Sequence, residues 1–78
     1  MDIHTFIEKL EEEFEDVTPG TLKAETSYKD IEGWDSMHAL IIIAMVDIEY
    51  SITLTGEDLQ KAVTIQDIFD IVKSRSEE

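Results

Sequence analysis

A chain of 78 residues without a single cysteine must hold its fold by packing alone. Its composition excludes disulfides and thiolate zinc sites, which stabilise many small domains. From the scaling of surface with mass, a chain of this size buries about 60% of its extended surface, which is enough for one modest core. We therefore expect residues 1–78 to form a single domain.

Apolar residues recur at helical spacing in three segments, and the capping-box pattern Thr55-Gly56-Glu57-Asp58 opens a short further helix, so the sequence predicts an all-α fold. Each of these four segments follows a residue that can cap a helix, namely Asp2, Asp35, Thr55 and Thr64. The predicted helices cover about residues 3–15, 36–50, 55–62 and 65–75. Together they predict a small four-helix bundle in up-and-down order, with three main helices and one short helix.

The connection from Asp16 to Asp35 has no helical or strand period, so we expect a long first loop. It begins at Thr18-Pro19-Gly20, which stops the first helix. Apolar residues in this loop, such as Tyr28 and Trp34, are expected to hold it against the core. The predicted core consists of Phe6, Leu10, Phe14, Ile42, Ile43, Val46, Ile65, Ile68, Phe69 and Val72.

The second helix carries two apolar stripes on nearly opposite faces. The stripe expected to face the core consists of Ala39, Ile42, Ile43, Val46 and Tyr50. The opposite stripe consists of Met37, Ile41, Ala44 and Ile48. One helix of so small a bundle cannot bury both stripes. We therefore expect the opposite stripe to lie on the surface beside Ser36, as an apolar patch that a soluble monomer rarely keeps without use.

The formal net charge of −13 argues against nucleic acids and anionic membranes as partners and favours basic patches on other proteins. No apolar run reaches the roughly 18 residues that a membrane span needs. The N-terminus shows no basic region followed by an apolar run, as a signal peptide would. We therefore expect a cytoplasmic, monomeric protein.

The reactive side chains are few and poorly placed for catalysis. Ser36 and His38 are two positions apart on one helix, so they do not face each other as a nucleophile and its base would. We expect His4 and His38 to be surface helix residues. The glutamates at 11–13 lack the spacing of a calcium loop and predict a solvated face, so no metal site is expected. The sequence therefore does not predict an enzyme.

Ser36 stands in the segment Gly33-Trp34-Asp35-Ser36-Met37, where the long loop meets the apolar helix. This segment resembles the Gly-x-Asp-Ser-Leu/Met motif of acyl carrier proteins, a four-helix family that carries 4′-phosphopantetheine on the serine. The length, the acidity, the long first loop and the Thr64-Ile65-Gln66-Asp67 start of the last helix are also similar, so the likeness covers essentially the whole chain. It implies that 4′-phosphopantetheine is attached to Ser36 and that Asp35 supports the attachment, near the metal of a phosphopantetheinyl transferase.

A helix N-terminus suits a phosphodiester because unpaired N–H groups and the helix dipole favour an anion there. The arm would supply the thiol that the sequence lacks. Acyl groups would then be held as thioesters and presented to acyl-loading and acyl-transfer enzymes, with a role in lipid metabolism. The residues expected to contact these partners are Met37, His38, Leu40, Ile41, Ala44, Asp47 and Ile48.

The chain also departs from the family pattern. Typical carriers of fatty acid biosynthesis have acidic residues two and five positions after the serine, where this chain has His38 and Ile41. Together with Trp34 and Met37, these differences favour a carrier of a dedicated lipid, polyketide or cell-surface pathway. The alternative from another class is a cofactor-free acidic adaptor that docks through an apolar face of its second helix. A third reading is an acidic mimic of nucleic acid. Such a mimic would prefer regularly spaced carboxylates on one surface, whereas the carboxylates of this chain are clustered.

Overall fold

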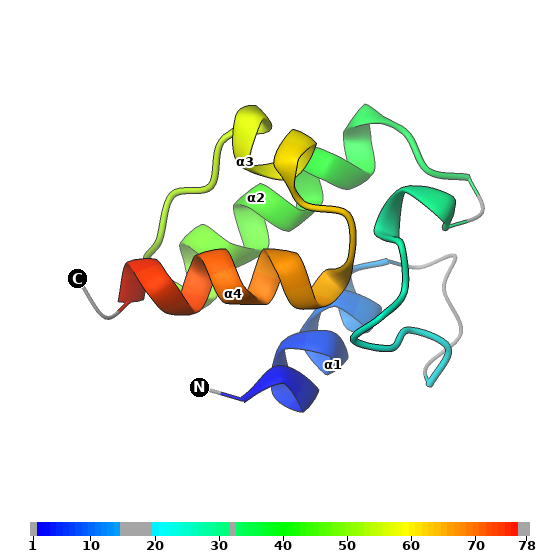
Figure 1. The fold of residues 1–78 in the computed structure, drawn as a ribbon, viewed down its shortest axis with the longest axis horizontal. Helices are drawn as coiled ribbons and strands as arrows, with labels where there is room; N and C mark the ends of the chain where they lie inside the picture. Colours follow the sequence, from blue (N-terminus) through cyan, green and yellow to red (C-terminus); the bar gives the residue numbers. More distant parts are fainter. Residues whose placement is uncertain (1, 15–19, 32, 77–78) are drawn as a thin grey trace.

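A computed structural model describes residues 2–14, 20–31 and 33–76, in which four α-helices surround one apolar core (Figure 1). The elements are α1 (Ile3–Glu13), the 3-10 turn η1 (Tyr28–Asp30), α2 (Ser36–Tyr50), α3 (Gly56–Lys61) and α4 (Ile65–Ser76). Within these residues no strand forms, and the only β-type pairing is an isolated bridge between Ser27 and Thr64. The all-α class and the four-helix arrangement are confirmed.

The helices begin where the sequence predicts a cap. Asp2 accepts a hydrogen bond from the backbone N–H of His4 at 3.0 Å, which starts α1. The helix α1 ends earlier than expected, at Glu13, because Phe14 adopts an extended backbone and buries its ring in the core. Residues 15–19, which include the Thr18-Pro19 part of the predicted stop, lie outside the described residues.

The predicted core is confirmed with one exception. Ile43 is only half-buried and packs at the edge of the core, whereas the other expected residues are buried. Leu22 and Tyr28 are also buried, as expected for residues that hold the first loop against the core. Further buried residues that were not predicted are Ile7, Met45, Ile52, Leu54, Leu59 and Ala62. Most of these lie in connections or in the short helix, where no long period marks a buried face.

The first loop is held against α3 and α4 by backbone and side-chain contacts. The ring of Tyr28 is buried, and its hydroxyl lies within hydrogen-bonding distance of the carbonyl oxygens of Leu59 and, at 2.9 Å, Ala62. The N–H groups of Ile65 and Gln66 donate to loop carbonyls at 3.1 and 2.9 Å. Burial, assisted by the negative charge of Asp67, raises the pKa of the Tyr28 phenol.

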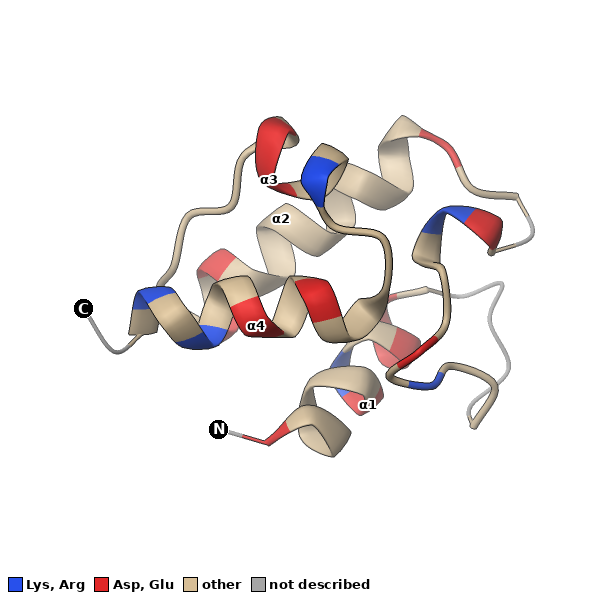
Figure 2. Cartoon of the chain, in the orientation of Figure 1, with Lys and Arg blue, Asp and Glu red and all other residues tan. Residues whose placement is uncertain are grey.

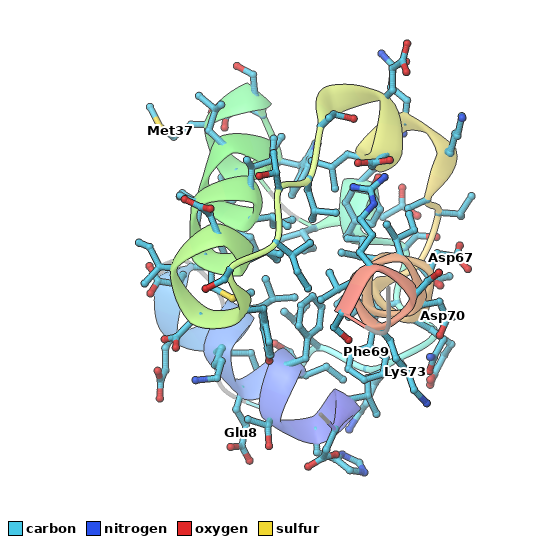
Figure 3. All side chains as sticks on the ribbon, turned by 90° about the vertical axis from the view of Figure 1, so that its left-hand side faces the viewer. Glu8, Met37, Asp67, Phe69, Asp70 and Lys73 are labelled. Carbon is cyan, nitrogen blue, oxygen red and sulfur yellow. The ribbon has the colours of Figure 1, made fainter. Side chains whose placement is uncertain are left out.

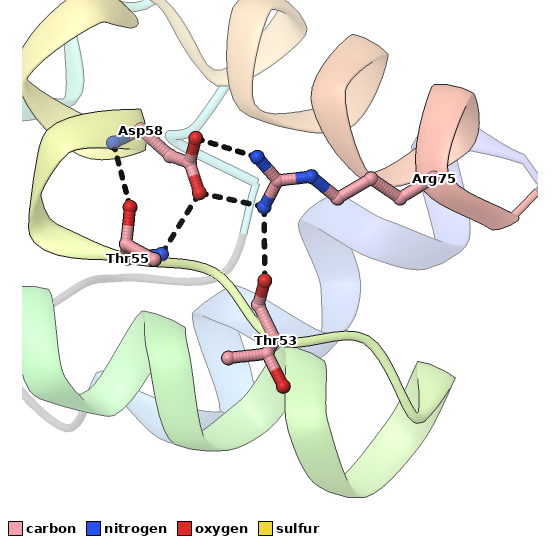
Figure 4. Close-up of polar contacts among 4 residues, drawn as sticks. All are labelled: Thr53, Thr55, Asp58 and Arg75. Atoms are coloured by element: carbon pink, nitrogen blue, oxygen red, sulfur yellow. Dashed lines mark hydrogen bonds and ion pairs between the residues drawn. The ribbon is translucent and has the colours of Figure 1, made fainter.

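An ion pair joins α3 to α4 (Figure 4). Two nitrogens of the Arg75 guanidinium contact the two carboxylate oxygens of Asp58 at 2.6 and 2.7 Å, and one of them also donates to the carbonyl of Thr53 at 2.9 Å. Such a fork is the strong geometry for this pair. Mainly because of these hydrogen bonds, the pKa of Asp58 falls to about 2.

Charge is distributed unevenly over the helices (Figure 2). The charged side chains of α2 are Asp47 and Glu49, both near its C-terminal end, so its first three turns carry no Asp, Glu, Lys or Arg. The N-terminal part of α2 therefore presents an uncharged surface on a very acidic protein.

Among the described residues, no helix is both long and apolar enough to cross a membrane.

Candidate functional site

Ser36 is the first residue of α2 and is exposed to solvent. The preceding residue, Asp35, has an extended backbone, and its Oδ1 accepts hydrogen bonds from the N–H groups of Met37 and His38 at 3.0 and 3.2 Å. The predicted N-cap is therefore confirmed. Because the carboxylate caps the helix, the Ser36 hydroxyl is not needed for capping and has no hydrogen-bond partner in the described part of the chain.

His38 lies in the interior, and the prediction that it is a surface residue is wrong. Only 9% of His38 is exposed, because its ring packs against Phe14 and Trp34 with centroid distances of 5.2 and 5.5 Å. A side chain so enclosed offers little surface to a partner. The pattern missed this burial because His38 belongs to neither apolar stripe of α2, and the first loop covers it.

The His38 ring also contacts Asp35. Its Nδ1 lies 2.9 Å from Oδ1 of that carboxylate. Since an ionised carboxylate only accepts hydrogen bonds, Nδ1 carries the proton and donates it. This hydrogen bond, followed by the one from the backbone N–H of His38, lowers the pKa of Asp35 below its usual range. The sequence signal for this contact was the spacing of three residues between Asp35 and His38 at the start of α2.

A cavity of about 460 Å³ opens beside Ser36. It lies between the first loop, α2 and α3, and its apolar lining includes Tyr28, Trp34, Ala39, Leu40, Ile43 and Leu59. Lys29 and Gln60 add polar side chains to the lining. The sequence did not predict this cavity, because its lining comes from three segments that are separated along the chain. Its lining explains why Ile43 is half-buried.

Of the seven residues expected to contact partners, five are exposed, Ile41 is half-buried and His38 is buried. Exposed side chains are Met37, Leu40, Ala44, Asp47 and Ile48, with 60% of Met37 and 78% of Ile48 accessible. In Figure 3 Met37 points away from the helices, whereas Phe69 points between them. Ile41 is half-buried and packs against the core, so the surface stripe is interrupted there. We call Met37, Leu40, Ala44 and Ile48 the exposed α2 face.

The start of α2 offers a hydroxyl that could hold a covalently attached arm. Among the described residues, no group of three or more His, Asp or Glu side chains is arranged to hold a metal ion. Ser36 instead provides an exposed hydroxyl at the N-terminus of a 15-residue helix, next to an apolar cavity. A phosphodiester can be stabilised at such a helix end, and an apolar chain can enter such a cavity.

Comparison with known proteins finds similarity to an acyl carrier protein. No protein-family model matches the chain, and no solved structure matches it. The acyl carrier protein of Bdellovibrio bacteriovorus is 28% identical over 75 residues, which are 96% of this chain and 96% of that protein. The similarity thus extends over nearly the whole of both chains. It confirms the resemblance to acyl carrier proteins that the residues around Ser36 indicate.

Proposed function

We propose that this protein carries acyl groups as thioesters on a 4′-phosphopantetheine arm attached to Ser36. The observation that carries this proposal is the exposed Ser36 hydroxyl, which follows a carboxylate N-cap at the start of a long apolar helix and lines an apolar cavity. The similarity to the Bdellovibrio protein supports the proposal. The arm supplies a terminal thiol, which this cysteine-free chain lacks.

Attachment requires the Ser36 oxygen to reach a phosphorus atom. With coenzyme A as donor, Oγ of Ser36 forms the new P–O bond, the bond to 3′,5′-ADP breaks, and the hydroxyl proton passes to a base of the phosphopantetheinyl transferase. The chain contributes an accessible hydroxyl and the positive end of the α2 dipole, which favours the phosphate. Asp35 holds the helix start in place and puts a carboxylate next to the reacting oxygen.

We assign the cavity beside Ser36 to the apolar part of the cargo. About 460 Å³ bounded by Trp34, Ile43 and Leu59 is enough space for a short acyl chain or part of the arm. Burial there would remove apolar surface from water and shield the thioester between encounters with enzymes. Cargo that does not enter this space would remain exposed to solvent.

We propose the exposed α2 face as the contact surface for acyl-loading and acyl-transfer enzymes and for the transferase. The occupant is an enzyme surface with an apolar groove and flanking basic residues, because Asp35 and Asp47 border an otherwise uncharged face. The exposed α2 face differs from the acidic second helix of typical fatty acid synthesis carriers. This difference supports a carrier of a dedicated pathway. We further propose that the carrier is monomeric and does not itself catalyse a reaction.

Intact mass tests the attachment directly. Apo-protein is incubated with coenzyme A, Mg²⁺ and a phosphopantetheinyl transferase, and we expect the mass of one phosphopantetheine group to be added to the wild type. Ser36→Ala should fold and gain nothing, whereas Ser74→Ala, which removes another exposed helical serine, should be modified as the wild type is. A modified Ser36→Ala variant, or an unmodified wild type, would overturn the proposal.

The exposed α2 face also supports the second candidate, the cofactor-free adaptor. The same assay separates the two, because an adaptor has no reason to accept the arm. The face itself is tested by Leu40→Glu, which should lower kcat/KM of the transferase about tenfold. Val63→Glu is the matched control, since Val63 and Leu40 are both 59% exposed. Equal rates for both variants would show that the transferase does not read this face.

A further inference from the structure

The buried histidine next to the attachment site has no role in the carrier chemistry described above. Apart from Tyr28 with its hydroxyl, His38 is the one buried polar or charged side chain in the described residues, and it lies two positions after Ser36. A polar group in a core is stabilised when it is hydrogen-bonded. For His38 one such hydrogen bond goes to Asp35 through Nδ1.

The ring of His38 is held in place by two other parts of the chain. Phe14 packs on it from the end of α1, and Trp34 packs on it from the first loop at an interplanar angle of 36°. Trp34 in turn contacts the buried ring of Tyr28 with a centroid distance of 5.2 Å. His38 is therefore a rigid donor, whereas Asp35 is a surface side chain, 63% exposed.

The contacts of the Asp35 carboxylate are unequal. Oδ1 receives the N–H of Met37, the N–H of His38 and the ring nitrogen of His38. Oδ2 has no hydrogen-bond partner within the described residues. Three donors converge on one oxygen of a side chain that is 63% exposed, so the other oxygen is left without a donor. A carboxylate capped only by backbone N–H groups could instead exchange its two oxygens by rotation.

We propose, on the basis of the function proposed above, that His38 is a positioning residue for the modification of Ser36. It fixes the Asp35 carboxylate so that Oδ1 caps α2 while Oδ2 remains available to the divalent cation used by the transferase. Mg²⁺ prefers oxygen ligands at near-ideal octahedral geometry, so the orientation of a single carboxylate oxygen matters. His38 acts through Asp35 and does not touch the reacting atoms.

The test compares two substitutions of His38. His38→Leu keeps an apolar filling but removes the donor, and His38→Asn places an amide nitrogen near the former Nδ1. We expect His38→Leu to lower kcat/KM of the transferase at least tenfold and to raise the Mg²⁺ concentration for half-maximal rate. His38→Asn should restore most of kcat/KM and most of the wild-type Mg²⁺ dependence. Phe69→Leu, a core change in α4, controls for lost stability and should leave the rate unchanged.

A double-mutant cycle identifies Asp35 as the intermediary. Asp35→Asn retains a capping oxygen but loses the charge, so it should slow modification by itself. In that background His38→Leu should change the rate less than twofold, since the carboxylate it orients is gone. Additive losses, or a wild-type rate for His38→Leu, would overturn the role of His38. A wild type that is never modified would instead overturn the proposed function.

Discussion

The N-terminus of α2 differs from those of α3 and α4 in the side chain that caps it. In α3 and α4 a threonine hydroxyl accepts the N–H of an aspartate three residues later, and that aspartate accepts the threonine N–H in return. In α2 a carboxylate is the cap. A hydroxyl that caps a helix is occupied, whereas the hydroxyl of Ser36, which follows a carboxylate cap, is available to react.

The surroundings of these helix starts differ as well. The first N–H groups of α4, those of Ile65 and Gln66, donate to carbonyls of the first loop, so that helix end is closed. The start of α2 is exposed and opens onto the cavity. A helix N-terminus in this fold is therefore available to an anion only where no other segment covers it. The α3–α4 side stabilises the fold, and the start of α2 holds the proposed attachment residue.

The largest expected difference between the α4 region and the start of α2 is in the unfolding free energy lost when a side chain is truncated. Phe69→Ala in α4 should cost about 3–5 kcal/mol of unfolding free energy, because a buried ring that contacts Phe6 is lost. Met37→Ala at the start of α2 should change it by less than about 0.5 kcal/mol, since Met37 is 60% exposed. Urea unfolding of both variants measures the difference. Similar losses would show that the two regions contribute equally to stability.

The second prediction concerns the contact between the first loop and α3. Tyr28→Phe removes the hydroxyl near the Leu59 and Ala62 carbonyls and should cost about 1–3 kcal/mol. Because the pKa of Tyr28 is raised in the folded protein, the phenol stabilises the fold below its unfolded pKa of about 10 and this contribution is lost as pH rises further. Unfolding free energies from pH 8 to 11 should therefore fall less steeply in the variant. Parallel curves would contradict this.

The third prediction concerns the ion pair between α3 and α4. Asp58→Asn should cost about 1 kcal/mol at pH 7, a modest value because Arg75 is 34% exposed. The pKa of Asp58 is lowered to about 2, so the ion pair stabilises the fold above the unfolded pKa of about 4 and its contribution disappears as pH falls through about 2. The wild type and the variant should thus converge in stability at low pH. A constant difference down to that pH would exclude this linkage.

The smallest effect tests the caps themselves. Thr64→Ala removes the hydroxyl that accepts the Asp67 N–H and should cost about 0.5–1 kcal/mol without affecting modification. Ser36→Ala should leave stability within about 0.5 kcal/mol and abolish modification. Thermal unfolding and intact mass on the same samples check both outcomes. A loss of stability in Ser36→Ala equal to that in Thr64→Ala would mean that the Ser36 hydroxyl contributes to capping after all.

Much of the fold follows from interactions between residues close in sequence. The caps at Asp2, Asp35, Thr55 and Thr64 depend on side chains and N–H groups two or three positions apart, so a pattern of residue types predicts them. The same local pattern places Ser36 at a helix start, whereas its choice as the candidate attachment residue came from the resemblance of its segment to the family motif. The expected end of the first helix was less accurate, since it depends on the burial of Phe14.

Sequence alone thus determined the helices and most of the core, since these rest on local hydrogen bonds or on the helical period, and the resemblance of one segment to a family motif indicated the candidate attachment residue. Tertiary structure decided which polar residue enters the core and where the cavity lies. His38 is buried because Phe14 and Trp34, distant from each other in the chain, meet on its ring. The cavity exists because α3 lies against the loop and α2. Such contacts depend on how segments are placed in space, and the periodicity of a single segment does not encode that placement.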